Sequence, residues 1–324
     1  MSLANPLTAV LLVVAVVFAL VKGLNDGASI VAVTSAGISF MPLAAVLTLG
    51  GVLVFGPLLV GTRVATTYAA GLVPAHGASG RLSFLIGLSV AMAVTAFLAT
   101  RGLPTSLTMA LVGGLAGAGA GSGLPVAWLT VATVVVVGLG APLLAGLVAS
   151  VVLSGLGRLP RGRSMQSRLK WLNYLSFGFQ TLAYSANDGQ SMLAVFAVAV
   201  SGTSAVEARL PELTVLAVAF CIGAVLGLGR VGPSLTRSLA LTGPADGIAA
   251  ELASTASAFA ARAFGAPVSM TMTMTAGLAG ARTRAGLRRV RWEQAARLLT
   301  AWAATLPLSA LVGATVAVSV RGLR

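Results

Sequence analysis

Long stretches without charge recur along the chain. Residues 7–21, 126–153 and 302–320 are largely apolar, and each approaches or exceeds the about 20 residues that a helix needs to cross a bilayer. The 324 residues are 57% hydrophobic and 9% charged, whereas soluble domains are roughly 45–50% apolar and about 25% charged. The excess apolar surface must face lipid. We therefore expect an all-α, multi-pass protein of the cell membrane, with about ten to twelve apolar segments.

Basic residues lie mainly between the apolar segments. The formal net charge of +14 would suit a nucleic-acid-binding domain, but the stretches 155–170 and 281–291 each hold five basic residues and no acid. Short basic loops of this kind are typical of the cytoplasmic side of membrane proteins. The positive charge thus predicts which loops face the cytoplasm. The expected partner is the lipid bilayer, and no nucleic acid is expected to bind.

Two unlike motifs are repeated at nearly the same offset. Asn-Asp-Gly at residues 25–27 recurs at 187–189, an offset of 162, and Gly-x-Pro-x-Ser-x-Thr-Met at 102–109 recurs at 265–272, an offset of 163. This pattern indicates duplication. We place the first transmembrane repeat at 1–154, a basic cytoplasmic linker at 155–170 and the second repeat at 171–324.

Equivalent loops of the two halves differ in charge. Residues 281–291 follow the second Pro-Ser motif and are basic, whereas the counterpart 117–125 has no charge. The second half begins after a basic linker, while residues 1–6 are uncharged. Arg321 and Arg324 oppose this orientation but are outnumbered. The pattern predicts an inverted-topology repeat, as in secondary transporters.

Two of the seven acids, Asp26 and Asp188, adjoin apolar runs at equivalent places. A carboxylate in the bilayer costs several kcal/mol, so such residues usually face a polar cavity or a partner. Asn-Asp-Gly favours a helix break, and broken helices at matching positions are typical of transport sites. We expect unwinding near mid-membrane and a cation site there, although capping of a helix end is the alternative.

The Pro-x-Ser motifs predict re-entrant hairpin tips followed by half-helices. Proline favours the first helical turn and serine caps N-termini, and a helix N-terminus suits an oxyanion. Ordinary Pro-kinked helices are the alternative. The expected hydroxyl ligands around one anion, with cation-loaded Asp26 and Asp188 nearby, are Ser106, Thr108, Ser269 and Thr271.

Glu251, Lys22 and His76 lie outside the repeated motifs. Glu251 has no acidic counterpart in the first half and fits either a proton or cation ligand or a structural partner for Arg262 or another buried donor. Lys22, four residues before Asp26, could pair with it or approach the anion, but snorkelling from a short half-helix is the simpler account. His76 is assigned no function.

These motifs resemble those of the inorganic phosphate transporter (PiT) family. Its Gly-Ala-Asn-Asp-x-Ala-Asn signature is similar to residues 23–29 and, in part, to 186–191, its Gly-x-Pro-Val-Ser-Thr-Thr-His hairpins to 102–109 and 265–272, and its C-terminal segment to 292–307. The resemblance implies an inverted-repeat helical fold and phosphate symport with sodium or protons. By position, it implies substrate binding by Asn25 and Asn187 and cation binding, sodium included, by Asp26 and Asp188. The expected cation ligands are completed by Ser29, Ser191 and Glu251.

Both copies depart from the family pattern in the same way. Serine replaces the second asparagine of the signature, and apolar residues replace the hairpin threonine and histidine. The positions concerned are Ser29, Ser191, Leu107, Met270, Met109 and Met272. Because donors and an imidazole are lost, sulfate or another tetrahedral oxyanion stays an alternative to phosphate, and sodium or protons are both open as the coupling ion.

Other classes of protein fit less well. An intramembrane aspartyl protease would use two carboxylates as a shared-proton dyad, but it gives paired hairpins no role, so we expect no enzyme and no cofactor beyond the coupling ion. A passive anion channel could use the same donors. The sequence leaves open whether the chain forms a homodimer.

Overall fold

The computed structural model describes residues 6–37, 41–101, 105–158, 164–201, 206–229, 243–283 and 292–323. Within these ranges the secondary structure is helical, as expected. The first half holds α1 (Pro6–Lys22), η1 (Gly23–Gly27), α2 (Ala28–Gly37), α3 (Pro42–Val60), α4 (Arg63–Thr66), η2 (Thr67–Gly71), α5 (Gly77–Thr100), α6 (Leu107–Gly121) and α7 (Trp128–Leu156). The second half holds α8 (Ser164–Ala186), α9 (Gln190–Ser201), α10 (Leu210–Leu228), α12 (Pro244–Ala263), α13 (Met270–Thr283) and α14 (Trp292–Gly322).

Six helices of the described chain are long and apolar enough to cross a membrane. The expected ten to twelve apolar segments include shorter helices besides these spans: α6, α9 and α13 have 15, 12 and 14 residues. Large apolar side chains on the longer helices face outward, such as Leu59 at 78% and Leu129 at 83% exposure. These surfaces are suited to lipid.

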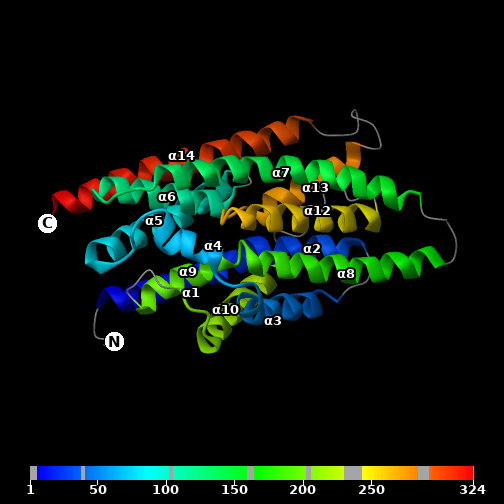
Figure 1. Ribbon diagram of the computed structural model, residues 1–324, viewed down its shortest axis with the longest axis horizontal. Coiled ribbons are helices and arrows are strands. Elements are labelled where there is room, and N and C mark those ends of the chain that lie inside the picture. The colour runs from blue at the N-terminus through cyan, green and yellow to red at the C-terminus, as the bar shows by residue number, and fades with distance from the viewer. Residues whose placement is uncertain are drawn as a thin grey trace.

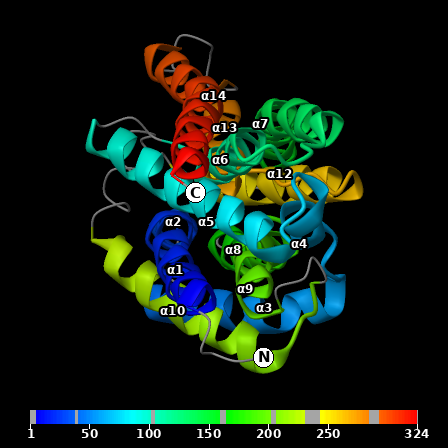
Figure 2. The same ribbon diagram turned by 90° about the vertical axis from the view of Figure 1, so that its left-hand side faces the viewer.

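The helices are stacked in layers (Figures 1 and 2). α3 and α10 form one outer layer, and α14 and α7 form the other. The α1–α2 and α8–α9 segments, which carry the two Asn-Asp-Gly motifs, lie between them. α10 packs on α1 and η1, α12 packs on α8, and α6 packs on α14. The two halves therefore interleave, and both motifs are enclosed on opposite sides by other helices.

The two hairpins enter from opposite ends of the molecule. α5 and α6 pack together at the end that carries the N- and C-termini, whereas α12 and α13 pack together at the other end (Figure 1). Their inner ends meet, because Met109 of α6 and Met272 of α13 share a buried cluster with Trp302. This is the expected inverted repeat, in which each half supplies one hairpin from its own side.

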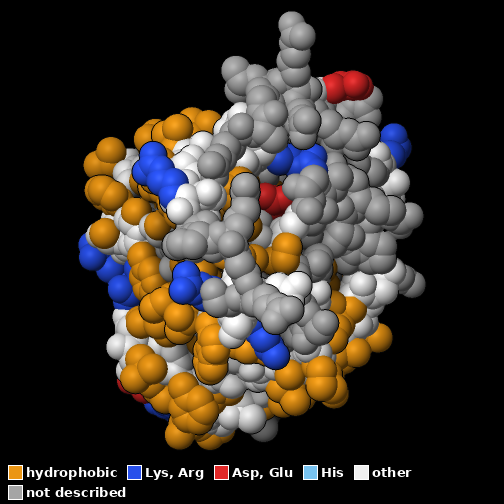
Figure 3. All heavy atoms as spheres, turned by 90° about the vertical axis from the view of Figure 1, so that its right-hand side faces the viewer, with side chains coloured by type: hydrophobic (Ala, Val, Ile, Leu, Met, Phe, Trp, Pro, Cys, Tyr) orange, Lys and Arg blue, Asp and Glu red, His pale blue; other side chains and the backbone are white. Residues whose placement is uncertain are grey.

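The described parts of the predicted basic stretches, residues 155–158, 164–170 and 281–283, lie toward the end remote from the termini. Figure 3 faces this end and shows several Lys and Arg side chains on its described surface. The predicted linker 155–170 is partly helical, since α7 continues to Leu156 and α8 begins at Ser164, while residues 159–163 and 284–291 lie outside the described residues. The uncharged stretch 117–125 was wrongly taken as a loop throughout, because α6 continues to Gly121.

A stripe of glycines explains why α6 extends so far. Gly113, Gly117 and Gly121 lie one turn apart, and a Cβ at each would overlap the backbone of α14. Small residues at this spacing let two membrane helices approach closely. The stripe fixes α6, and with it Ser106 and Thr108 at its N-terminal end.

We expect Gly117→Ala to lower the free energy of unfolding by about 1–3 kcal/mol, because the new methyl group would overlap the Ala310 backbone and displace α14. Gly140→Ala on α7 is the matched control, since nothing lies within 4 Å of a Cβ there. That change should be neutral or stabilising by up to about 1 kcal/mol. Thermal unfolding in detergent measures both, and equal shifts for the two variants would contradict this account of the stripe.

Candidate functional site

The two Asn-Asp-Gly motifs have different backbones. In the second copy the helix is broken as expected, since α8 ends at Ala186 and α9 begins at Gln190. In the first copy the expected unwinding is wrong: residues 23–27 form a π-helical turn that joins α1 to α2. A Cβ at Gly23 or Gly27 would overlap Phe220 of α10, so close packing against α10 keeps this turn helical. Widened turns of this kind are frequent at functional sites.

The serine that follows each aspartate bonds to its own motif. The Ser29 hydroxyl donates to the Asn25 carbonyl at 2.5 Å, and the Ser191 hydroxyl donates to the Asp188 carbonyl at 2.8 Å. Both serines are buried. Each hydroxyl oxygen keeps lone pairs that a cation could use, because donation engages only its hydrogen.

The hairpin tips are capped by their serines. The Ser106 hydroxyl accepts from the Met109 N–H at 3.2 Å, and the Ser269 hydroxyl accepts from the Met272 N–H at 3.5 Å. Ser269 also bonds to Thr271 at 2.9 Å between hydroxyl oxygens. The chain before Ser106 includes residues 102–104, which lie outside the described residues, so the proline of the first tip is not placed.

Asn187 is bound to the second hairpin rather than to its own motif. Its amide nitrogen donates to the carbonyls of Ala258 and Ala266, each at 3.2 Å, and its amide oxygen accepts from the Val268 N–H at 2.9 Å. Asn25, its counterpart, donates to the Asp26 carboxylate at 2.8 Å. The equivalent amides therefore fix different partners: Asn187 the second tip, and Asn25 a carboxylate.

Asp188 lies where the two hairpins meet. One carboxylate oxygen accepts from the Thr108 hydroxyl at 2.6 Å and from Lys22, and the other accepts from the Met270 N–H at 3.2 Å. Thr108 belongs to the first hairpin and Met270 begins α13 of the second. The carboxylate is thus held by donors from both repeats, including the N-terminus of a helix, where negative charge is stabilised.

Asp26 faces the same cluster from the other repeat. Its carboxylate accepts from Asn25, from the Tyr184 hydroxyl at 3.3 Å, and from the Lys22 ammonium at 3.1 Å. The Tyr184 ring packs on Phe220 with 5.5 Å between centroids. The structure therefore brings together Asp26, Asp188 and Thr108, three of the predicted site residues, around Lys22.

The snorkelling account of Lys22 is wrong. Its side chain is 0% exposed, and its ammonium forms ion pairs with both aspartates. A lysine at the end of a short apolar helix can reach water only if nothing nearby offers a better partner, and here two carboxylates do. The spacing of four residues between Lys22 and Asp26 was the sequence signal for this pair.

Glu251 lies in a second buried polar cluster. Its carboxylate accepts from the hydroxyls of Thr34 on α2 and Ser176 on α8, and not from the suggested partner Arg262. Ser254 follows Glu251 by three residues on α12, and its hydroxyl oxygen lies 2.6 Å from that of Thr273 on α13, to which it is hydrogen-bonded. This cluster connects the α2–α8–α12 interface to the helix that follows the second tip.

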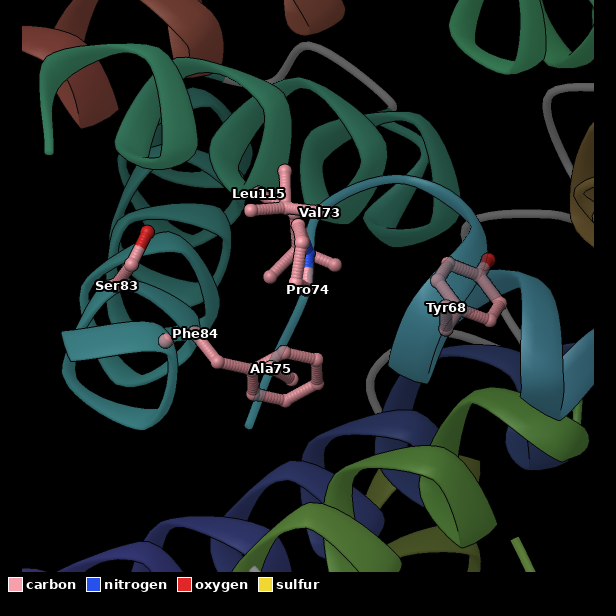
Figure 4. Close-up of a pocket in the computed structure, with 8 residues that line it drawn as sticks. Tyr68, Val73, Pro74, Ala75, Ser83, Phe84 and Leu115 are labelled. Atoms are coloured by element: carbon pink, nitrogen blue, oxygen red, sulfur yellow. The ribbon is translucent and has the colours of Figure 1, made fainter. Parts of the chain in front are cut away.

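A pocket lies beside the first hairpin. It is narrow and its walls are mostly apolar, with Val73, Phe84 and Leu115 among them. Figure 4 shows the Tyr68 ring at its edge, with the hydroxyl pointing away from the other lining residues. That hydroxyl is buried and lies near Thr108 and Asp188. Tyr68 had no sequence signal, yet it faces both the pocket and the cluster.

The chain is similar to proteins of one family. The model of the phosphate transporter family matches residues 22–177 and 160–313. A probable low-affinity inorganic phosphate transporter of Mycobacterium tuberculosis (strain ATCC 25618 / H37Rv) is 36% identical over 139 residues, which are 41% of this chain and 33% of that protein. One of the same description from Rhizobium meliloti (strain 1021) is 28% identical over 155 residues, 47% of this chain and 46% of that protein.

A solved structure titled "The sodium-dependent phosphate transporter" has the same fold, with a TM-score of 0.77, 17% identity, and coverage of 97% of this chain and 100% of that chain. The matches to the two curated relatives span between a third and just under half of those proteins. With six apolar spans and this all-helical fold, the chain is a multi-pass integral membrane protein, and the curated relatives are described as transporters rather than enzymes. Because the family model matches most of its length, the chain belongs to the phosphate transporter family.

Proposed function

We propose that this protein carries inorganic phosphate across the cell membrane in symport with sodium or protons. The observation that carries the proposal is the convergence of the Thr108 hydroxyl, the Met270 N–H and the Lys22 ammonium on the carboxylate of Asp188. These are the types of donor that bind a tetrahedral oxyanion, and they come from both repeats. The names of the relatives and of the structural neighbour favour phosphate among oxyanions.

The substrate ligands in this proposal are the six predicted from sequence, with distinct tasks. Ser106, Thr108, Ser269 and Thr271 present hydroxyls at the two hairpin tips. Asn25 and Asn187 also hold other groups of the site in place, because the Asn25 amide is bonded to Asp26 and the Asn187 amide to the second tip. The buried Tyr68 hydroxyl, near Thr108 and Asp188, offers one more donor at the first tip.

The cation ligands in this proposal surround the two carboxylates. Asp26 and Asp188 supply charge, sodium being bound there if sodium is the coupling ion, and Ser29 and Ser191 supply hydroxyl oxygens. Glu251 serves at a separate position on α12, where it is fully buried. Oxygen ligands of these types suit hard cations such as sodium.

Coupling follows from competition for the same donors. Incoming phosphate must displace the Asp188 carboxylate from Thr108 and Met270, which leaves that carboxylate free to bind a cation. A multivalent anion about 5 Å from a carboxylate is repelled by several kcal/mol at an effective dielectric of about 20. Because a bound cation offsets this repulsion, each ligand raises the affinity for the other.

The proposed units of the chain are the two transmembrane repeats, 1–154 and 171–324, joined by the basic linker 155–170. Each unit contributes one motif aspartate and one hairpin to the site. Their interleaved packing means that neither unit encloses the site by itself. We infer that the repeats act together as one transporter, and that the linker faces the cytoplasm.

Uptake into proteoliposomes tests the proposal. Labelled phosphate and labelled sulfate would be supplied under an imposed inward sodium gradient, an inward proton gradient, or neither. Symport predicts accumulation of phosphate above equilibrium under at least one gradient. Preference for sulfate would redirect the proposal to another tetrahedral oxyanion, and entry that only equilibrates under every condition would favour a passive channel.

A further inference from the structure

Lys22 ends α1 beside the Asp26 turn, and its ammonium group is fully enclosed. The nitrogen lies 3.1 Å from an Asp26 oxygen and 3.3 Å from the Thr108 hydroxyl, and it also contacts Asp188. One ligand thus comes from the first motif, one from the second and one from the first hairpin. Lys22 is the point at which both repeats converge.

The surroundings of the Lys22 nitrogen are those of a small cation. Two carboxylate oxygens and a hydroxyl are the ligands that sodium or another hard cation takes in proteins. An ammonium group is likewise a compact point charge that donates to oxygens. Sodium and the ammonium group therefore require the same position between Asp26 and Asp188.

The charge balance of the cluster depends on this lysine. Two buried carboxylates and one ammonium carry one net negative charge. The other strongly buried basic residue of the described chain, Arg81, is bonded to Thr8 and to the Ala199 carbonyl instead. Without Lys22 the cluster would carry two unbalanced buried charges, which a protein tolerates only when they are paired.

We propose that the Lys22 ammonium holds the cation position between Asp26 and Asp188, so that the protein carries as a fixed residue one positive charge that a mobile cation would otherwise supply. This inference rests on the proposed cation-coupled oxyanion transport. It implies that wild-type protein takes up one mobile cation fewer at these carboxylates than a variant without the lysine. Lys22 is thus a residue that sets the coupling stoichiometry.

Sodium binding without any anion tests the inference directly. Equilibrium binding of labelled sodium to detergent-purified protein would be compared for wild type and Lys22→Gln at fixed pH. Lys22→Gln is expected to bind one more sodium ion than wild type, because the amide oxygen completes the vacated position. Equal stoichiometry in the two proteins would overturn the proposal.

Phosphate binding gives a second measurement. The slope of the logarithm of phosphate affinity against the logarithm of sodium concentration reports the number of sodium ions bound with the anion, by linkage. This slope should be steeper by about one in Lys22→Gln than in wild type. An unchanged slope would contradict the proposal even if phosphate binding itself is intact.

Three further variants separate charge from packing. Lys22→Arg keeps the charge and should keep the wild-type sodium stoichiometry, and Lys170→Gln, at an exposed site, should have no effect on it. Lys22→Gln combined with Asp26→Asn restores one net negative charge and should lose the extra sodium ion. Retention of that ion in the double variant would overturn the proposal.

The outcomes distinguish this inference from the proposed function. Wild-type protein that binds no phosphate or sulfate under any cation would remove the function, while the sodium stoichiometry would still decide the role of Lys22. If Lys22→Gln folds only in sodium, its unfolding temperature should rise with sodium more than that of wild type, which supports the proposal. If it folds in no condition, Glu251→Gln decides, because this variant keeps Lys22 and both aspartates but removes the separate carboxylate: two sodium ions bound without anion would overturn the proposal, and at most one would support it.

Discussion

Asp188→Asn is expected to abolish gradient-driven phosphate uptake, with a loss of at least about a hundredfold. The change removes the charge that three donors share, and with it the group that the coupling cation would bind. A loss of about 2.7 kcal/mol in stabilisation of the transport step corresponds to about a hundredfold, since about 1.4 kcal/mol is tenfold in rate. The amide oxygen can still accept from the Thr108 hydroxyl, but the amide nitrogen then faces the Met270 N–H, which loses its acceptor at a cost of about 1–3 kcal/mol. Because Lys22 stays paired with Asp26, the protein should fold with that reduced stability. Initial uptake rates in proteoliposomes, together with thermal unfolding in detergent, measure the two effects separately.

Asp26→Asn should abolish coupled uptake as well, since it removes the other carboxylate of the cluster. Its fold is expected to be kept because Lys22 remains paired with Asp188. Glu207→Gln is the matched control: this carboxylate is 67% exposed and pairs with Arg209 at 2.7 Å, and exposed pairs contribute roughly 0–1 kcal/mol. Wild-type uptake in both aspartate variants would show that the carboxylates serve structure and that the proposed site is wrong.

Much of the fold could be predicted because duplication and charge act over the whole chain. The repeated Pro-x-Ser motifs predicted two half-helices, and α6 and α13 begin one residue after Ser106 and Ser269. The basic stretches predicted opposite orientations, and the two hairpins enter from opposite ends (Figure 1). Predictions of this kind are reliable because helix capping by serine and the orientation of basic loops depend little on distant parts of the chain.

Contacts between distant segments were harder to predict. The π-helical turn at 23–27 depends on Phe220, which lies about 200 positions further along the chain, and nothing in Asn-Asp-Gly encodes that neighbour. Lys22 presented an ambiguous signal, because its second partner, Asp188, is brought close only by the inverted repeat. Nothing in the sequence distinguishes Tyr68 and Tyr184 from other residues of apolar segments. Their hydroxyls come near the carboxylates only in the folded chain.

Asn187→Ala is expected to lower the free energy of unfolding by about 3 kcal/mol or more and to abolish uptake. Three buried hydrogen bonds to Ala258, Ala266 and Val268 would be lost, and each buried partner left unsatisfied costs about 1–3 kcal/mol. The second tip positions the Met270 N–H on Asp188, so its release should also disturb the site. Thermal unfolding in detergent and uptake assays measure both losses.

Asn25→Ala provides the comparison, because this equivalent amide makes one described side-chain hydrogen bond, to Asp26. It should destabilise the protein by only about 1 kcal/mol. The same substitution in the two copies of the motif should therefore lower stability by different amounts.

Asn187→Asp is a second test of the contact between Asn187 and the second tip. It keeps an acceptor for the Val268 N–H but turns a carboxylate oxygen toward the Ala258 and Ala266 carbonyls, so it should destabilise the protein at least as much as alanine does. Equal losses for Asn25→Ala and Asn187→Ala, or a stable Asn187→Asp protein, would show that the amide does not hold the second tip.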